Sequence, residues 1–223
     1  LLWVNHEYMN PLFVSEYNYR NKNQKRTKQQ VDTEMYQVGG SIVRIKEENG
    51  TWNVVKNDPL NRRITAKTPM KINWDSPIKG ATTVIGTLAN CSGGITPWKT
   101  FLTCEENYDN FYGETIYDSQ NKPQHKPSTY YNWETFYKYP PEHYGWVVEI
   151  NPKDGSTQKH IALGRFAHEC CTLYELKDKR VVAYSGDDAN DEHLYKFISS
   201  TPSSLKEGTL YVADTINGKW LPL

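Results

Sequence analysis

The sequence has no long apolar run and no excess of charge. Apolar segments such as residues 82–88 are far shorter than the roughly 18 residues of a membrane-spanning helix, and the mean hydropathy is −0.76. Lys and Arg together number 26, as do Asp and Glu, so no net charge attracts the chain to nucleic acid or to an anionic membrane. We therefore expect a protein that neither spans a membrane nor binds nucleic acid.

Cysteine is scarce, and several catalytic motifs are absent. The 4 cysteines show no CxxC spacing, and a disulfide between the adjacent Cys170 and Cys171 would be strained, so cysteine usage leaves the redox compartment open. No GxSxG, GxxxxGKS/T, GxGxxG or HExxH pattern supports a serine hydrolase, a nucleotide-binding loop or a zincin. The chain begins and ends inside apolar segments, with no signal peptide at its start, so we expect it to be part of a longer protein.

Short apolar or aromatic segments, separated by Gly, Pro, Asn and Asp, dominate the sequence. Their length, β-branched residues and turn residues predict strands, so the fold class is all-β. Only residues 29–36 show a helical pattern, of about two turns. The predicted strands are residues 1–4, 41–45, 52–55, 82–88, 100–104, 145–150, 160–163, 172–176, 180–184, 193–198 and 209–213.

A unit of strand, polar turn and second strand recurs at residues 41–52, 146–155 and 209–220. Hairpins that reappear after several tens of residues are typical of β-propeller blades. We predict a single domain over residues 1–223 that forms an incomplete β-propeller with long irregular loops; a sandwich or an irregular barrel is the alternative. The segment 108–143, rich in Tyr, Pro, Asn and Trp, is interpreted as a lid over a site.

Acidic side chains gather in four clusters where predicted strands end. Carboxylates bind hard cations such as calcium, and they can also hold iron or manganese. Solvated turns are the alternative for any single cluster, but four clusters in the same position favour convergence at one mouth of a propeller. The acidic candidates are Glu7, Glu105, Glu106, Glu169, Asp187 and Asp188.

Cys91 lies in the Gly-containing segment NCSGG of residues 90–94, where its thiolate can ligate a metal. A small buried residue beside a turn is the equally supported alternative. Cys104 alternates with apolar residues and is expected in the core, and packing is the expected role of Cys170 and Cys171.

Asn61, Arg62 and Arg63 offer amide and guanidinium donors for an oxyanion. A surface arginine pair is an equally plausible interpretation.

The string NCSGGITPWKTFLTCEEN at residues 90–107 closely resembles the signature of the PhoX-type alkaline phosphatases. The resemblance covers nearly the whole chain but only the N-terminal and central part of such an enzyme. Supporting blocks are VNHEY at 4–8, NRRIT at 61–65, LGRFAHE at 163–169, GDD at 186–188 and GTLYVA at 208–213.

This resemblance implies a hydrolase of small-molecule phosphate monoesters that serves phosphate scavenging. The family is built on a β-propeller, carries calcium and iron in its active site, and is periplasmic or secreted after export by the twin-arginine route. A monomer is expected. Because the later part of the family's chain supplies further ligands, including an arginine, residues 1–223 alone are expected to be inactive.

The resemblance also assigns roles to individual residues. Cys91 resembles the family's thiolate iron ligand. Asn61 and Arg62 are the expected phosphate contacts. Glu105, Glu106 and Glu169 fall where the family's carboxylate metal ligands lie, and Glu7, Asp187 and Asp188 are further candidates for calcium.

The sequence departs from the family's pattern at Lys99, where Gly usually follows Pro-Trp. Gly39-Gly40 stands in place of His-Gly, and Cys170-Cys171 follows His-Glu where small residues are usual. These departures concern the fine geometry of the site.

Two other functions compete with phosphomonoester hydrolysis. A non-catalytic, calcium-stabilised propeller would bind a partner through its aromatic segment. A calcium-dependent lactonase or esterase on a propeller would share the acidic mouth and would need no iron.

Overall fold

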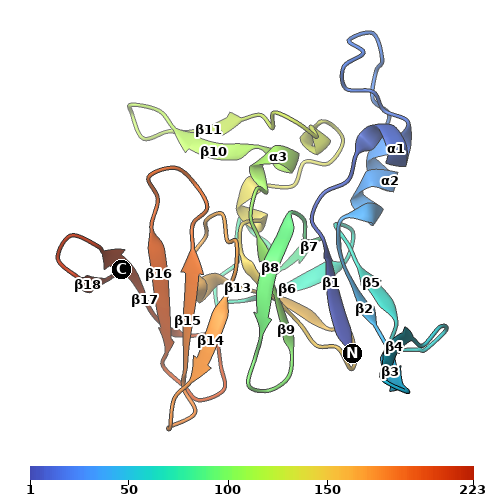
Figure 1. Cartoon of the computed structure of the whole chain (residues 1–223). Coiled ribbons are helices and arrows are strands. Elements are labelled where there is room, and N and C mark those ends of the chain that lie inside the picture. Colours follow the sequence, from blue (N-terminus) through green and yellow to red (C-terminus); the bar gives the residue numbers. More distant parts are fainter.

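Strands make up most of the regular structure in the computed structural model, which describes residues 1–223 (Figure 1), and the all-β prediction is confirmed. The helices are short, and none is long and apolar enough to cross a membrane. They are α1 (Pro11–Ser15), α2 (Lys28–Gln37), α3 (Asp109–Tyr112) and the 3-10 turns η1 (Trp133–Thr135), η2 (Pro141–His143) and η3 (Ile161–Leu163).

A six-stranded sheet forms the centre of the molecule, in the order β7-β6-β13-β12-β9-β8. Its pairs are antiparallel except β13 with β6. Every residue of β12 is buried, because Val147 packs into one apolar cluster and Val148 into another on the opposite face. The strands are β6 (Pro69–Asn73), β7 (Thr83–Ile85), β8 (Asn90–Ile95), β9 (Phe101–Glu105), β12 (Val147–Ile150) and β13 (Thr157–His160).

Two further sheets flank the central one (Figure 1), and no sheet closes on itself. An antiparallel meander in sequence order contains β14 (Thr172–Glu175), β15 (Val181–Gly186), β16 (Leu194–Ser199), β17 (Gly208–Asp214) and β18 (Lys219–Pro222). On the other side, β1 (Leu2–His6), β2 (Gly39–Val43) and β5 (Arg62–Ile64) form a three-stranded sheet. Two separate hairpins are β3 (Ile45–Glu48) with β4 (Thr51–Val54), and β10 (Glu114–Tyr117) with β11 (Pro123–Lys126).

The aromatic segment 108–143 forms part of a core, which corrects the interpretation of it as a lid. Phe111 and Trp133 are fully buried, and they pack in one cluster with Val31 and Met35 of α2. The Trp133 indole donates to the buried Glu34 carboxylate over 2.9 Å. Because these rings are buried against α2, this part of the segment is fixed in a core and is not free to open.

The helix is confirmed, and a hairpin lies at each of the three predicted units. In the first unit the hairpin strand is Ile45–Glu48, whereas residues 41–43 belong to β2 and pair with β1 and β5. Helix α2 begins with a capping box between Thr27 and Gln30. The strand predicted at residues 160–163 is wrong, because the chain makes the 3-10 turn η3 there and the strand is the preceding, polar β13. Lys159 in β13 is buried nonetheless, because its Nζ donates to the Glu105 carboxylate and to the His143 carbonyl.

Candidate functional site

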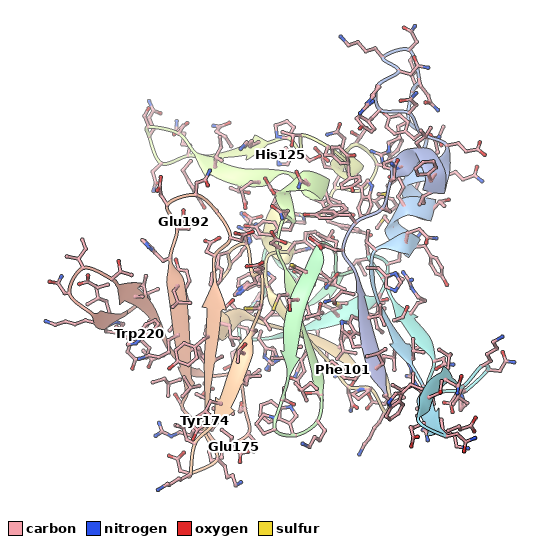
Figure 2. The ribbon with its side chains drawn as sticks, in the orientation of Figure 1. Phe101, His125, Tyr174, Glu175, Glu192 and Trp220 are labelled. Atoms are coloured by element: carbon pink, nitrogen blue, oxygen red, sulfur yellow. The ribbon has the colours of Figure 1, made fainter.

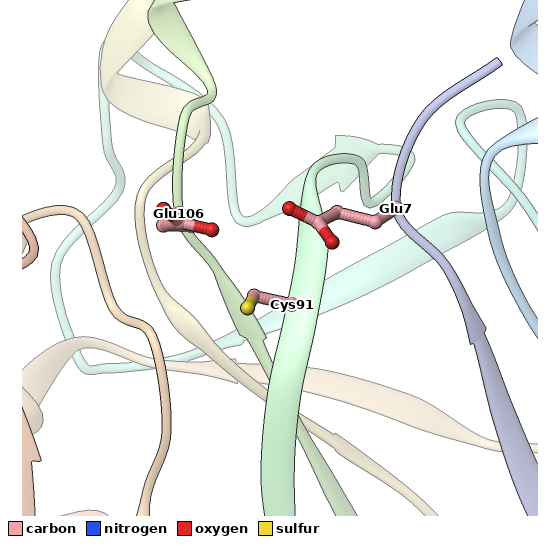
Figure 3. A group of neighbouring side chains, drawn as sticks. All are labelled: Glu7, Cys91 and Glu106. Atoms are coloured by element: carbon pink, nitrogen blue, oxygen red, sulfur yellow. The ribbon is translucent and has the colours of Figure 1, made fainter.

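One thiol and two carboxylates meet where three strands approach each other. Cys91 lies on β8, Glu7 follows β1 directly, and Glu106 follows β9 directly. Their ligand atoms all lie within 4.8 Å of one another, and Figure 3 shows the three side chains pointing into the same space. We call this set the Glu7–Cys91–Glu106 group.

Hydrogen bonds on both sides hold the Cys91 backbone in place. The Asn5 amide of β1 donates to the Cys91 carbonyl over 2.5 Å. The Asn5 Oδ1 in turn accepts from Thr103 Oγ1 at 2.7 Å, so β1, β8 and β9 are joined through one side chain. From the opposite side, the Ser92 N–H donates to the Glu169 carbonyl over 2.9 Å. The Cys91 thiol therefore lies on a strand that hydrogen bonds hold in place on both sides, and not on a free loop.

A close approach between strands explains why glycine follows Cys91. A Cβ added at Gly93 would lie 1.9 Å from the Leu102 carbonyl oxygen of β9. Only glycine allows β8 to run this close to β9. Glycine has a low β-propensity, so the two glycines at 93 and 94 explain why strand β8 was not predicted from the sequence.

The electrostatics of the group favour a bound cation. Burial, together with the nearby Glu106, Glu7 and Glu169 carboxylates, raises the pKa of the Cys91 thiol to about 12. Burial likewise raises the pKa of Glu106 to about 6, although hydrogen bonds from Cys91 and Asn107 oppose the shift. Neither Glu7 nor Glu106 forms a salt bridge with a basic side chain.

Three further predicted residues lie beside the group. The Asp188 carboxyl lies close enough to Glu106 to raise its pKa, and Glu106, Asp187 and Asp188 line a common cleft of about 380 Å³. The Asp187 carboxylate accepts from the Ala167 N–H at 3.2 Å, and burial raises its pKa. Glu169 lies close enough to Cys91 to act on its pKa. The structure thus gathers Glu7, Cys91, Glu106, Glu169, Asp187 and Asp188 in one region.

Glu105 does not join them, which corrects its expected role as a metal ligand. Its side chain is fully buried and forms an ion pair of 2.6 Å with Lys159 Nζ. The other carboxylate oxygen accepts from the backbone N–H groups of Gly145 and Trp146 at 3.0 and 3.1 Å. Glu105 and Glu106 are adjacent in an extended chain, so their side chains leave on opposite sides.

Asn61 and Arg62 also lie outside the group, which corrects their expected role as phosphate contacts. The Asn61 side chain binds a turn, accepting from the Arg44 N–H at 2.6 Å and donating to the Val55 carbonyl at 2.8 Å. The Arg62 guanidinium donates to backbone carbonyls, including that of Lys153 at 3.5 Å.

Arg63 and Tyr8 contact residues next to the group, and neither was predicted as a site residue. The Arg63 guanidinium lies 3.2 Å from the ring of His6, the residue before Glu7, and donates to the Tyr36 and Gln37 carbonyls at the end of α2. The Tyr8 hydroxyl accepts from the Asn107 amide over 2.9 Å, next to Glu106. Arg63 follows the candidate Arg62, and Tyr8 follows the candidate Glu7. This position beside a candidate residue is the sequence feature that could have indicated them.

A thiolate together with carboxylate oxygens is a donor set that can bind metal ions in an all-β protein. The chain belongs to the PhoX family of alkaline phosphatases, because the family model described as "Alkaline phosphatase PhoX" matches residues 1–223.

A solved structure is similar over nearly the whole chain. It is Pseudomonas fluorescens PhoX in complex with vanadate, a transition state analogue, with 31% sequence identity and a TM-score of 0.79. The match covers 99% of this chain and 45% of that chain, so the present chain spans less than half the length of its structural relative. No curated protein sequence matches the chain.

Proposed function

We propose that the whole protein hydrolyses small-molecule phosphate monoesters for phosphate scavenging, with the Glu7–Cys91–Glu106 group as part of its active site. The observation that carries the proposal is the convergence of this thiol and these carboxylates within a chain of the PhoX family. The similar structure was solved with vanadate, a transition state analogue, which supports phosphoryl chemistry over a purely structural scaffold.

Calcium and iron fit the residues present. A thiolate with carboxylates suits iron, whereas carboxylates alone suit calcium. Cys91 and Glu106 would hold iron, and Glu7, Glu169, Asp187 and Asp188 would complete the iron and calcium ligands. Glu106 is buried and forms no salt bridge, which supports the assignment because a buried acid needs a compensating charge.

Bound cations neutralise the charge that develops on the phosphoryl oxygens during transfer. The chain's own residues provide the frame for this chemistry. Asn5 holds the Cys91 carbonyl, which sets the direction of the thiol. Asn107 orients the Tyr8 hydroxyl beside the carboxylates. The Arg165 guanidinium lines the cleft beside Asp187 and Asp188 and is held by Glu114 at 2.9 Å.

Family membership also supports proposals about the whole protein. The three adjacent sheets (Figure 1) are candidates for blades of a β-propeller that further chain would complete, with residues 1–223 as one domain. We propose a periplasmic or secreted monomer exported by the twin-arginine route. Both proposals rest on the family.

The test uses the full-length protein, analysed for metals and assayed with a generic phosphomonoester, with calcium present and after chelation. We expect iron and calcium in the purified protein and hydrolysis that requires calcium. Undiminished hydrolysis after exhaustive removal of both metals would contradict the mechanism. Calcium without iron and without hydrolysis would favour the non-catalytic propeller, and hydrolysis of a lactone without iron would favour the lactonase.

A matched pair of cysteine variants tests the site itself. Cys91→Ser is expected to lose iron and at least a hundredfold in kcat/KM, since the thiolate ligand is removed. Cys170→Ser is the control, because Cys170 is also half-buried but lies outside the Glu7–Cys91–Glu106 group. Equal iron content and activity in both variants would exclude Cys91 as a ligand.

A further inference from the structure

An aromatic pocket of about 500 Å³ adjoins the Glu7–Cys91–Glu106 group. It is lined by Tyr8, Met9, Asn10, Asn110, Tyr130 and Tyr131. The lining comes from the segment after β1 and from the aromatic segment 108–143, so two regions distant in sequence form it together.

Tyr8 connects the pocket to the group. It follows Glu7 in sequence, and its hydroxyl is bonded to Asn107, the residue after Glu106, at 2.9 Å. Its ring belongs to the pocket wall and remains 46% exposed. Tyr8 therefore lies between the pocket and the Glu7–Cys91–Glu106 group.

The rest of the aromatic wall is held in position from behind. Tyr131 is buried, stacks on Phe111 with ring centroids 4.3 Å apart and donates to the Met9 carbonyl at 3.0 Å. Tyr130 packs edge-on against Tyr131 at 4.6 Å and remains 40% exposed. A rigid wall with exposed ring surface binds planar groups without a large ordering cost.

Free amide groups accompany the rings. The Asn110 side chain forms no hydrogen bond within the chain, and Asn10 uses only its Oδ1, which accepts from the Leu12 N–H at 3.0 Å. Two amides beside aromatic faces can bond the polar edge of a ring that stacks between them.

We propose that this pocket binds the leaving group of the phosphomonoester and selects substrates in which that group is a planar aromatic ring, such as an aryl group or a nucleobase. The inference rests on the proposed function, because it places the phosphate of the same substrate at the Glu7–Cys91–Glu106 group. Tyr130 and Tyr8 provide the stacking surface, and Asn110 contacts the ring edge.

The test compares phenyl phosphate with glycerol phosphate in the full-length, metal-loaded enzyme. Tyr130→Leu is expected to lower kcat/KM for phenyl phosphate about tenfold, mainly through KM, because a stacking surface is lost. Its kcat/KM for glycerol phosphate should stay within about twofold, since that substrate has no ring to stack. Retained glycerol phosphate hydrolysis also shows that the variant is folded and loaded.

Two further variants sharpen the comparison. Tyr130→Phe keeps the ring and is expected to keep the preference for phenyl phosphate. Tyr174→Leu is the matched control, because Tyr174 is an exposed tyrosine of β14, at the end of the molecule away from α3 (Figure 2). It should change neither substrate.

The outcomes separate the two proposals. If the wild-type enzyme hydrolyses both substrates and Tyr130→Leu affects them equally or not at all, the pocket proposal is overturned while the phosphatase proposal stands. If the wild-type enzyme hydrolyses neither substrate, the proposed function fails and the pocket proposal fails with it.

Discussion

Two carboxylates that are adjacent in sequence lie in opposite chemical environments. Glu105 points into the protein, where Lys159 Nζ lies 2.6 Å away and two backbone N–H groups complete its hydrogen bonds. Glu106 points to the other side, into a space shared with Glu7 and Cys91 and without a basic partner. The first region carries its own compensating charge, and the second does not.

This difference separates a structural carboxylate from a candidate ligand. A buried carboxylate with an internal cation and satisfied hydrogen bonds has no remaining capacity for a metal. A buried carboxylate such as Glu106, whose pKa burial raises to about 6, gains stability from a cation supplied from outside. The predictions below test this comparison, from the largest expected effect to the smallest.

Removing the charge of Lys159 should destabilise the protein around Glu105. In Lys159→Met the Glu105 carboxylate remains buried without its partner, so the free energy of unfolding should fall by about 3–5 kcal/mol. Denaturant unfolding measures the change. Lys206→Met, which removes an exposed lysine paired with Asp75, should change the free energy of unfolding very little. A similar small effect of both changes would mean that Glu105 does not depend on Lys159.

Glu149 is a second buried carboxylate with partners inside the protein. Its contribution to the free energy of unfolding should be lost at acidic pH. Burial alone would raise its pKa, but hydrogen bonds from His160, Thr100 and Trp98 outweigh burial and lower the pKa to about 2. Because the folded pKa lies below the unfolded value, this group's stabilisation is complete above about pH 4.5 and is lost as the pH falls toward 2. The contribution at neutral pH is about 3 kcal/mol.

Unfolding free energies measured between pH 6 and pH 2 test this assignment. The acid-dependent loss should be smaller in Glu149→Gln, which has no titrating group at this position. Glu207→Gln is the control, since Glu207 is an exposed carboxylate that forms no side-chain ion pair. An unchanged pH profile in Glu149→Gln would refute the assignment.

Removing a hydrogen bond that positions Cys91 should weaken metal binding at the Glu7–Cys91–Glu106 group without removing a ligand. Asn5→Ala deletes the hydrogen bond to the Cys91 carbonyl, and we expect the affinity for iron to fall about tenfold, as for other groups that orient ligands. Metal retention during dialysis against graded chelators provides the measurement. Asn53→Ala in the exposed β3–β4 hairpin should retain metal like the wild type. Normal retention in Asn5→Ala would show that β8 is held without Asn5.

The smallest effect concerns the turn that joins the strands carrying Cys91 and Glu105. Lys99 lies in this turn with φ +69°, in the left-handed region that favours glycine. Lys99→Gly should therefore raise the free energy of unfolding by up to about 1 kcal/mol. Lys71→Gly, inside strand β6, should instead lower it by about 0.5–1 kcal/mol. Destabilisation by Lys99→Gly would show that side-chain contacts outweigh the backbone strain.

Local patterns predicted much of the fold but not all of its strands. Helix α2, strand β12 and the hairpins β3–β4 and β17–β18 follow from capping residues, alternation and turn residues. Strand β13 was missed because its residues, Thr157 to His160, are polar. Their burial depends on Glu105 and Glu149, which lie on other strands.

The sequence by itself determined the all-β class, the acidic clusters at strand ends and the segment around Cys91 that resembles the PhoX family, because these depend on neighbouring residues. Only the tertiary structure decided that Glu106 joins Cys91 while Glu105 pairs with Lys159, and that segment 108–143 builds a core and a pocket. Adjacent residues in an extended chain face opposite sides. What each side meets is set by strands far away in the sequence.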